Sequence, residues 1–227
     1  MDKINWSYRI NQYGGELTPT IVQGKKIVPV NNHYPFIQQT THKTMKQILL
    51  SSLLFSSAYL LEDSKPYQGK AHQIPGKIEA ENYDEGKAEV AYHDIDTKNH
   101  GANYRGSTQV DIEKRSDASN GYGIGWTRKG EWLHYTVEVK ESGTYSIEIP
   151  VASNKKGGLF HLEIKGKDVT GPIDIPDTGG WQILKVLKHK NVELIKGRHI
   201  IRAVMDSEGP SGSIGDIDYM KFEKTSP

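Results

Sequence analysis

Aromatic residues on glycine-rich segments give the strongest chemical signal in this sequence. The run 122–135 carries several aromatic residues among glycines, and Trp181 follows Gly179 and Gly180 directly. Glycine allows a tight turn or a close approach of the backbone to a ligand, and a tryptophan after two glycines is poorly placed to fill a core. Such a ring offers a flat, rigid face to an outside partner. Because sugar rings also have flat apolar faces with polar edges, the pattern predicts a sugar-binding surface.

Two groups of carboxylates could also carry chemistry. Glu79 and Glu81 are two residues apart on an expected strand, so their side chains face the same way. Like charges on one face repel each other, so the pair needs a cation or a salt bridge, for which Lys77 is at hand. The second group, Asp111 and Glu113, is considered below with the catalytic alternatives.

Charge and cysteine content exclude several classes of function. The formal net charge of the 227 residues is +1, which gives no electrostatic case for binding nucleic acid or an anionic membrane. The absence of cysteine excludes disulfides, Cys-ligated zinc and thiol nucleophiles. No His-Glu-x-x-His metal motif and no Gly-x-Ser-x-Gly elbow is present.

The N-terminal part differs in composition from the rest. Residues 1–44 show no sustained hydrophobic period and are expected to be irregular, or to be an upstream extension that is not truly translated. The apolar run that follows Met45 and ends at Leu61 is shorter than the ~20 residues of a membrane span and resembles a signal-peptide core. The alternatives are a buried helix or an uncleaved anchor. With Met45 as the start, the protein is expected to be secreted, with 62–73 a linker and no membrane span in the mature form.

The sequence from about residue 74 onward is all-β. Leu133, Tyr135 and Val137 alternate with polar residues, and the same period of two recurs at 145–151 and 160–164. Further strands are expected near 182–189, 197–205 and 212–224. Many short strands with turn signals between them predict a β-sandwich of two antiparallel sheets, a jelly roll, over residues 74–224, with 225–227 as a tail.

Motifs in this region resemble one family in order and spacing. They are Ile78-Glu-Ala-Glu-Asn-Tyr, Val110-Asp-Ile, Tyr122-Gly-Ile-Gly-Trp-Thr, Gly130-Glu-Trp-Leu-His-Tyr, Gly143-Thr-Tyr, Val169-Thr-Gly-Pro, Asp177-Thr-Gly-Gly-Trp-Gln and Asp216-Ile-Asp-Tyr-Met-Lys-Phe. Together they resemble carbohydrate-binding module family 6, a calcium-containing β-jelly roll. Residues 1–73 resemble no part of it.

The resemblance implies a set of sugar-binding residues. Trp181 and Tyr122 match the two aromatic positions that flank a sugar in a loop cleft. Asp216 stands where many members have an asparagine that hydrogen-bonds the sugar; an ionised aspartate only accepts hydrogen bonds, so Asn120 is a candidate for the missing donor. Trp126 is a further candidate, either in the loop cleft or in a second cleft that some members carry on a sheet face.

The resemblance also implies a structural Ca²⁺ ion held by Glu79, Glu81 and Asp218. Calcium takes six to eight oxygen ligands, so backbone carbonyls around Arg105 are expected to complete the shell. Asp218 can meet the first strand if the two ends of the module pair.

Catalysis is the alternative to binding. The run 109–113 resembles the strand motif of laminarinase-like and agarase-like hydrolases, but Gln109 replaces the first glutamate, so the nucleophile is missing. We therefore expect no catalytic residues, and a module that binds a plant or algal polysaccharide and targets an attached or associated glycoside hydrolase. The open alternatives are a small hydrolase or lyase with its site on the same sandwich, and a lectin-like adhesion module.

Overall fold

The computed structural model describes residues 5–9, 16–20, 22–23 and 26–27 and, without a break, residues 64–225. The chain divides into two units, residues 1–60 and 61–227. In the first, β1 (Asn5–Arg9) pairs with β2 (Glu16–Thr20), and β3 (Val22–Gln23) with β4 (Lys26–Ile27). Sequence analysis did not predict these four strands. The signal-like segment 45–61 lies outside the described residues.

The second unit consists of strands, with one short 3-10 turn, η1 (Tyr67–Gly69). Its strands are β5 (His72–Ile74), β6 (Gly76–Glu79), β7 (Tyr92–His93), β8 (Ile112–Lys114), β9 (Tyr122–Ile124), β10 (Trp132–Val139), β11 (Gly143–Ser153), β12 (Leu159–Ile164), β13 (Lys167–Asp168), β14 (Ile173–Asp174), β15 (Gly180–Leu194), β16 (Gly197–Ser207), β17 (Asp216–Ile217) and β18 (Tyr219–Lys224). The predicted all-β sandwich is confirmed.

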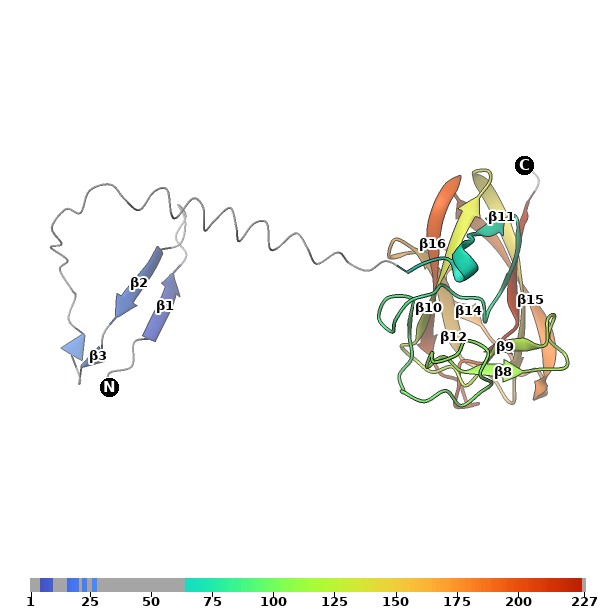
Figure 1. Ribbon diagram of the computed structural model, residues 1–227, viewed down its shortest axis with the longest axis horizontal. Coiled ribbons are helices and arrows are strands. Elements are labelled where there is room, and N and C mark those ends of the chain that lie inside the picture. Colours follow the sequence, from blue (N-terminus) through green and yellow to red (C-terminus); the bar gives the residue numbers. More distant parts are fainter. Residues whose placement is uncertain (1–4, 10–15, 21, 24–25, 28–63, 226–227) are drawn as a thin grey trace. The chain divides into compact units, whose positions relative to one another are not determined.

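Two sheets form the sandwich (Figure 1). The first, called here the β10 sheet, has the order β13-β12-β16-β10-β5, with β14 on β12 and β7 on β10. The second, the β11 sheet, has the order β6-β18-β11-β17-β9-β8, with β15 on β11. All neighbours are antiparallel except β5 and β10, which run parallel. The pairing of β6 with β18 joins the two ends of the module, which is the condition under which Asp218 can meet the strand that carries Glu79.

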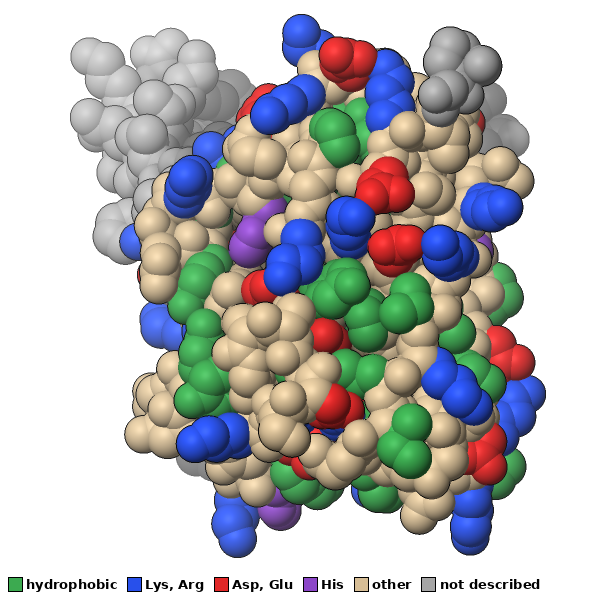
Figure 2. Space-filling model, turned by 90° about the vertical axis from the view of Figure 1, so that its right-hand side faces the viewer, with side chains coloured by type: hydrophobic (Ala, Val, Ile, Leu, Met, Phe, Trp, Pro, Cys, Tyr) green, Lys and Arg blue, Asp and Glu red, His purple; other side chains and the backbone are tan. Residues whose placement is uncertain are grey.

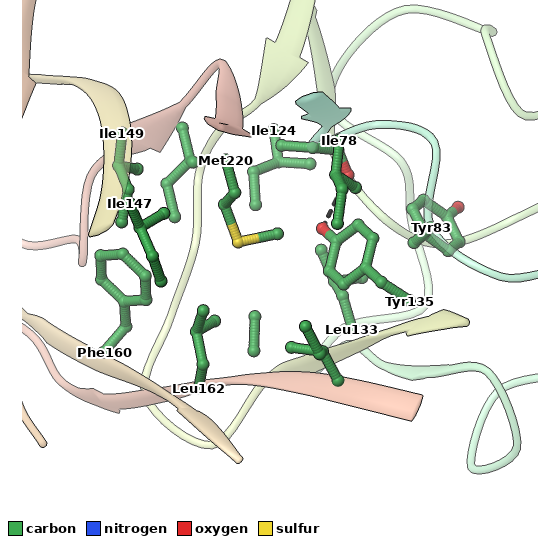
Figure 3. Close-up of a cluster of buried hydrophobic side chains, with 14 of the residues drawn as sticks. Ile78, Tyr83, Ile124, Leu133, Tyr135, Ile147, Ile149, Phe160, Leu162 and Met220 are labelled. Atoms are coloured by element: carbon green, nitrogen blue, oxygen red, sulfur yellow. Dashed lines mark hydrogen bonds between the residues drawn. The ribbon is translucent and has the colours of Figure 1, made fainter. Parts of the chain in front are cut away.

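The core lies between the sheets and follows the alternation in the sequence. Leu133, Tyr135 and Val137 of β10 are buried, whereas His134 and Glu138 on the other face are partly exposed. Figure 3 shows Tyr135 beside Ile78 and Leu133, on the opposite side of the cluster of buried side chains from Ile147 and Phe160. The Tyr135 hydroxyl donates to the carbonyl of Ala80 at 2.8 Å, so this polar atom is satisfied inside the core.

Two boundaries differ from the sequence prediction. Residues 64–73, expected as linker, belong to the module: Ser64 donates to Asp84 at 2.9 Å, and β5 pairs with β10. Strand β15 is also longer than expected, because a bulge around Asn191 (φ 63°) lets its pairing with β11 continue. Figure 2 shows one face of the molecule, on which basic and acidic side chains are interspersed.

Candidate functional site: a pocket between two tryptophans

A pocket of about 320 Å³ opens where the β8–β9 region meets the start of β15. Two tryptophan side chains and several polar groups line it. The lining residues are Glu113, Trp126, Arg128, Trp181, Ser211, Gly212, Ser213 and Asp216. Its volume is within the range of small-molecule sites, which is roughly 300–1,000 Å³.

Trp126 is presented to the pocket by an unusual backbone conformation. It follows β9 with φ 49°, in the left-handed region, and its residue surface is 47% exposed. A non-glycine residue in this region costs about 1–3 kcal/mol and is found more often at functional sites. Glycine also fits the preceding position closely, since a Cβ on Gly125 would lie 3.1 Å from Oδ1 of Asp216, a tight contact. The chain therefore turns sharply and places a large ring at the surface.

Trp181 is held by a well-bonded loop. Gly179 has φ 96°, which glycine adopts readily, and its N–H donates to Oδ1 of Asp177 at 2.8 Å. Thr178 is buried, and its hydroxyl accepts from the N–H of Ser153 at 2.9 Å. These hydrogen bonds fix the loop before β15, so the Trp181 indole lines the pocket as a rigid stacking face.

The polar wall of the pocket is built on a buried arginine. Arg115 is 1% exposed, and its Nη1 donates to Glu113 at 2.7 Å and to Asp216 at 2.6 Å. Its Nε and Nη2 both donate to Asp117, at 3.1 and 2.9 Å. The other oxygen of Glu113 accepts from Gln182 at 2.7 Å.

Electrostatics follow from this arrangement. Burial, and then the charge of neighbouring Glu113, raise the pKa of Asp216 to about 7, against the opposing effect of Arg115. One guanidinium therefore faces three carboxylates, and the wall is rich in hydrogen-bond acceptors. Arg128, at the rim, donates from Nε to Glu208 at 2.8 Å.

The structure does not bring Tyr122 to Trp181. Tyr122 is not among the described residues that line the pocket; its ring lies 4.6 Å from that of Tyr104, and it packs against the core. Asn120 is also elsewhere, because its amide donates to Glu81. Of the predicted sugar-binding residues, the pocket contains Trp126, Trp181 and Asp216. It adds Glu113 and Arg128, which sequence reasoning did not place there.

The three predicted metal ligands lie near one another but are bridged by other side chains. The Ser119 hydroxyl donates to Glu79 at 2.7 Å and to Asp218 at 3.3 Å, and Lys77 pairs with Glu79 at 2.5 Å. Glu81 is fully buried. It follows the end of β6 in a turn, so the prediction that it shares a strand with Glu79 is wrong.

One carboxylate oxygen of this cluster has no hydrogen-bond partner among the described residues. Oε2 of Glu81 is buried without a hydrogen-bond partner, and burial raises the pKa of this carboxyl. Arg105, expected near a shell of carbonyls, donates to the carbonyl oxygens of Glu81 and Tyr83 at 2.9 and 2.7 Å. In the described part of the chain, no three acidic or histidine side chains are arranged to hold a metal ion. The oxygen atoms of this cluster suit a cation, but the Ser119 hydroxyl and the Lys77 ammonium bind Glu79 and Asp218 in the arrangement described here.

A second set of carboxylates lies beneath the loop at 93–100. Burial, and then the charges of Asp94 and Asp111, raise the pKa of Glu131 to about 8, although its carboxylate accepts from the N–H of Arg128 at 2.8 Å. Burial likewise raises the pKa of Asp94 to about 6. These residues line a small enclosed space apart from the tryptophan pocket.

Comparison with known proteins supplies the family. Residues 100–224, more than half of the chain, match carbohydrate binding module family 6. A module of lichenase 5A from Cellvibrio mixtus, solved with cellotriose, is 26% identical with a TM-score of 0.50, over 67% of this chain and 99% of that one. A β-1,3-glucan-binding module from Bacillus halodurans is 23% identical with a TM-score of 0.52, over 68% and 99%, and shows the same fold.

Curated relatives match over shorter stretches. The alpha subunit of clotting factor G from Tachypleus tridentatus is 36% identical over 88 residues, and a beta-agarase from Microbulbifer thermotolerans is 30% identical over 82 residues. These stretches cover 38% and 36% of this chain but only 13% and 18% of the relatives. No helix within the described residues is long and apolar enough to cross a membrane. The sandwich, the tryptophan pocket and the match over 100–224 together show that the chain belongs to carbohydrate-binding module family 6.

Proposed function

We propose that this chain is a non-catalytic module that holds a plant or algal polysaccharide in the pocket between Trp126 and Trp181. The observation that carries the proposal is the pairing of two indole rings with the acceptor wall of Glu113 and Asp216 in one pocket. The rings stack on the apolar faces of a sugar, and the carboxylates accept hydrogen bonds from its hydroxyl groups.

The relatives support a polysaccharide ligand. The Cellvibrio mixtus module was solved with cellotriose, and one curated relative is an agarase. Both names point to polysaccharides of plant or algal origin. Glucans and agarose are therefore the first ligands to test on this chain.

The polar wall supports binding rather than catalysis. Glycosidases hold two carboxyl groups ~5 to 9.5 Å apart, with the sugar or a water between them. Here Glu113 and Asp216 both accept from the same nitrogen of Arg115, at 2.7 and 2.6 Å, so the guanidinium occupies the space between those oxygens. The raised pKa of Asp216 follows from burial beside Glu113.

The module is proposed to act as part of a larger assembly. It spans a small share of the curated relatives that it matches, one of which is a glycoside hydrolase by name. Attachment to a polysaccharide raises the local concentration of an associated catalytic domain at its substrate. We propose this targeting role, with an attached or associated glycoside hydrolase as the partner.

We also propose that the protein is exported, because segment 45–61 resembles a signal-peptide core. A signal peptide that starts at Met45 would end after ~15–30 residues, and the folded contacts of the module begin at Ser64. The secreted form is therefore expected to begin at roughly residue 60 to 64. Finding Met1 at the N-terminus of the secreted protein would contradict this.

We also propose that Glu79, Glu81 and Asp218 hold a structural Ca²⁺ ion. The buried, unpartnered Oε2 of Glu81 supports this, because a buried carboxylate oxygen needs a hydrogen bond or a cation. Displacement of the Lys77 and Ser119 bridges would free the other carboxylates. The ion would offset two of the three negative charges and tie β6 to the start of β18.

The proposed function is tested with the full chain on native gels that contain hydroxyethylcellulose, laminarin, xylan or agarose. Retardation on at least one gel, without release of reducing sugar from the same polysaccharide, is the expected result. Retardation on none of them refutes polysaccharide binding. Sustained release of reducing sugar that disappears in Glu113→Gln refutes the non-catalytic assignment.

A further inference from the structure

The polar wall of the tryptophan pocket carries more negative than positive charge. Glu113 and Asp216 line the pocket, and Asp117 binds the same guanidinium. Within residues 64–225, the ion pairs of these three carboxylates all run to Arg115, at 2.7 Å for Glu113, 2.6 Å for Asp216 and 2.9 Å for Asp117. When all four groups are ionised, two negative charges remain in excess. Such a local surplus attracts ligands of positive charge.

The cation at the rim of the pocket does not cancel this surplus. Arg128 lines the pocket, but its Nε donates to Oε1 of Glu208 at 2.8 Å, so the pair adds no net charge. The other residues of the lining are neutral. The pocket therefore favours a positively charged group on a sugar and opposes a carboxylate or a sulfate.

Asp216 keeps one oxygen for a ligand. The residue is 4% exposed, and its Oδ2 accepts from Nη1 of Arg115 at 2.6 Å. Its Oδ1 accepts no hydrogen bond from any other residue of the described region, and it lies close to Gly125, where a Cβ would be 3.1 Å away. Glu113, in contrast, uses both of its oxygens, for Gln182 and for Arg115. Because a carboxylate in so little contact with water needs a donor, Oδ1 of Asp216 is the acceptor that a ligand would satisfy.

The two indoles suit the same kind of ligand. The face of a tryptophan ring attracts a cation, and Trp126 and Trp181 line the pocket together with the carboxylates. An ammonium group has three N–H donors, and its hydrogen bonds to a carboxylate are stronger than those of a neutral donor. A sugar with a protonated amine can stack its apolar face on an indole while its charge meets Asp216. A neutral sugar gains the stacking but not the interaction of opposite charges.

We propose that the tryptophan pocket prefers sugars that carry a protonated amino group, as in a deacetylated, β-1,4-linked glucosamine chain, over the same sugars with a hydroxyl or an acetylated amine. The ammonium donates to Oδ1 of Asp216 beside Glu113, and the ring stacks on the indoles. This extends the ligands beyond neutral polysaccharides, and it rests on the proposed function, since the sugar must lie in this pocket. The preference belongs to this chain rather than to the family, because many members resemble it but have an uncharged asparagine in place of Asp216.

The test compares three tetrasaccharides that differ only at C2 of each ring: those of glucosamine, glucose and N-acetylglucosamine, all β-1,4-linked. Their affinities for the full chain are measured by calorimetry at neutral pH, where an amine with a pKa of about 7.7 is mostly protonated. The buffer contains about 0.15 M salt, which screens exposed charges beyond ~8 Å. Since a charge-assisted hydrogen bond replaces a neutral one, the glucosamine tetramer should bind at least about fivefold more tightly than each of the other two.

A conservative variant identifies the group responsible. Asp216→Asn keeps the shape of the side chain and an oxygen that can accept from Arg115, but it removes the charge. The ratio of the affinities for the glucosamine and glucose tetramers should then fall to within about twofold of one. Because a partly unfolded variant loses affinity for both tetramers alike, this ratio is not changed by a loss of stability.

A matched control removes two carboxylates elsewhere. Glu193→Gln/Glu223→Gln changes two exposed residues whose strands pair with β11 at Thr144 and Ser146, whereas the strand of Trp181 meets β11 at Ser153 beside the pocket. The affinity ratio of this variant should stay within about twofold of that of the parent chain.

Three outcomes overturn the preference: the glucosamine tetramer binds no more tightly than the glucose tetramer, the ratio persists in Asp216→Asn, or the control variant loses the ratio as well. Each of them leaves the proposed function standing, provided that the same protein is retarded on at least one polysaccharide gel. Retardation on no gel refutes the proposed function separately.

Discussion

Replacement of Trp126 by alanine tests whether the sugar lies between Trp126 and Trp181 or, as the family resemblance implied, between Tyr122 and Trp181. Trp126 is 47% exposed and lies in a strained backbone conformation, so it supports the fold only in part. A fully buried tryptophan would cost ~3 to 5 kcal/mol, and we expect about 2 kcal/mol or less here. The loss of one stacking face should weaken sugar binding by ~1 to 3 kcal/mol, by analogy with base–aromatic stacking. That corresponds to about 5- to 150-fold in the dissociation constant.

The assay is titration calorimetry with an oligosaccharide of the polysaccharide that retards the protein on gels, with thermal unfolding measured alongside. Trp181→Ala should give a loss of similar size. Tyr122→Ala is the matched control, because the Tyr122 ring packs at a tilt of 42° against that of Tyr104, outside the pocket; it should lower stability and leave affinity within about threefold. Loss of binding in Tyr122→Ala together with full binding in Trp126→Ala would refute the position of the site.

Four further outcomes follow from the described contacts. Chelation should lower the melting temperature, since an ion at 100 times its dissociation constant stabilises by ~2.7 kcal/mol, and Glu81→Gln should abolish this response. The raised pKa of Glu131, to about 8, means that the folded state holds its proton more tightly than the unfolded state. Its contribution to stability is present below about pH 4.5 and is lost as the pH rises through 8; denaturant midpoints across this range should decline, and Glu131→Gln should flatten the decline. Arg115→Met should cost about 3–5 kcal/mol in chemical denaturation, because it leaves the buried carboxylate of Asp216 without its partner; retention of stability would contradict the role of Arg115. Assays of reducing ends should show no hydrolysis at any pH, and a rate that depends on Asp216 would show catalysis.

The sandwich could be predicted from the sequence because each core strand alternates apolar and polar residues. The alternation around Leu133 and Tyr135 determines which face of β10 enters the core, and burial in the structure follows it. The short strands β7, β8, β13 and β14 could not be predicted, because two or three residues carry no measurable period. Their pairing depends on neighbours distant in the chain. The same holds for residues 64–73, whose polar composition resembles a linker although β5 pairs with β10.

Part of the tryptophan pocket could be predicted from the sequence. The glycines before Trp181 indicated a ring on a turn; it lies just after the turn, as the second residue of β15. The acceptor wall was missed because it depends on Arg115, whose buried position and triple carboxylate contacts leave no local trace in the sequence. An arginine among Glu113, Asp117 and other polar residues normally indicates a solvated segment. A buried arginine is recognised only when a residue about a hundred positions away, here Asp216, is known to pair with it.

The β8–β9 hairpin explains why Tyr122 and Asn120 lie outside the tryptophan pocket. The outward strand carries Glu113 into the tryptophan pocket, and its connection carries Ser119 and Asn120 to the acidic cluster around Asp218. The return strand brings the chain back to the pocket at Trp126. Ile217 pairs with Ile124 between the two sites, with Asp216 on one side and Asp218 on the other. Residues a few positions apart therefore serve different sites, and proximity in sequence is a poor guide to membership of the pocket.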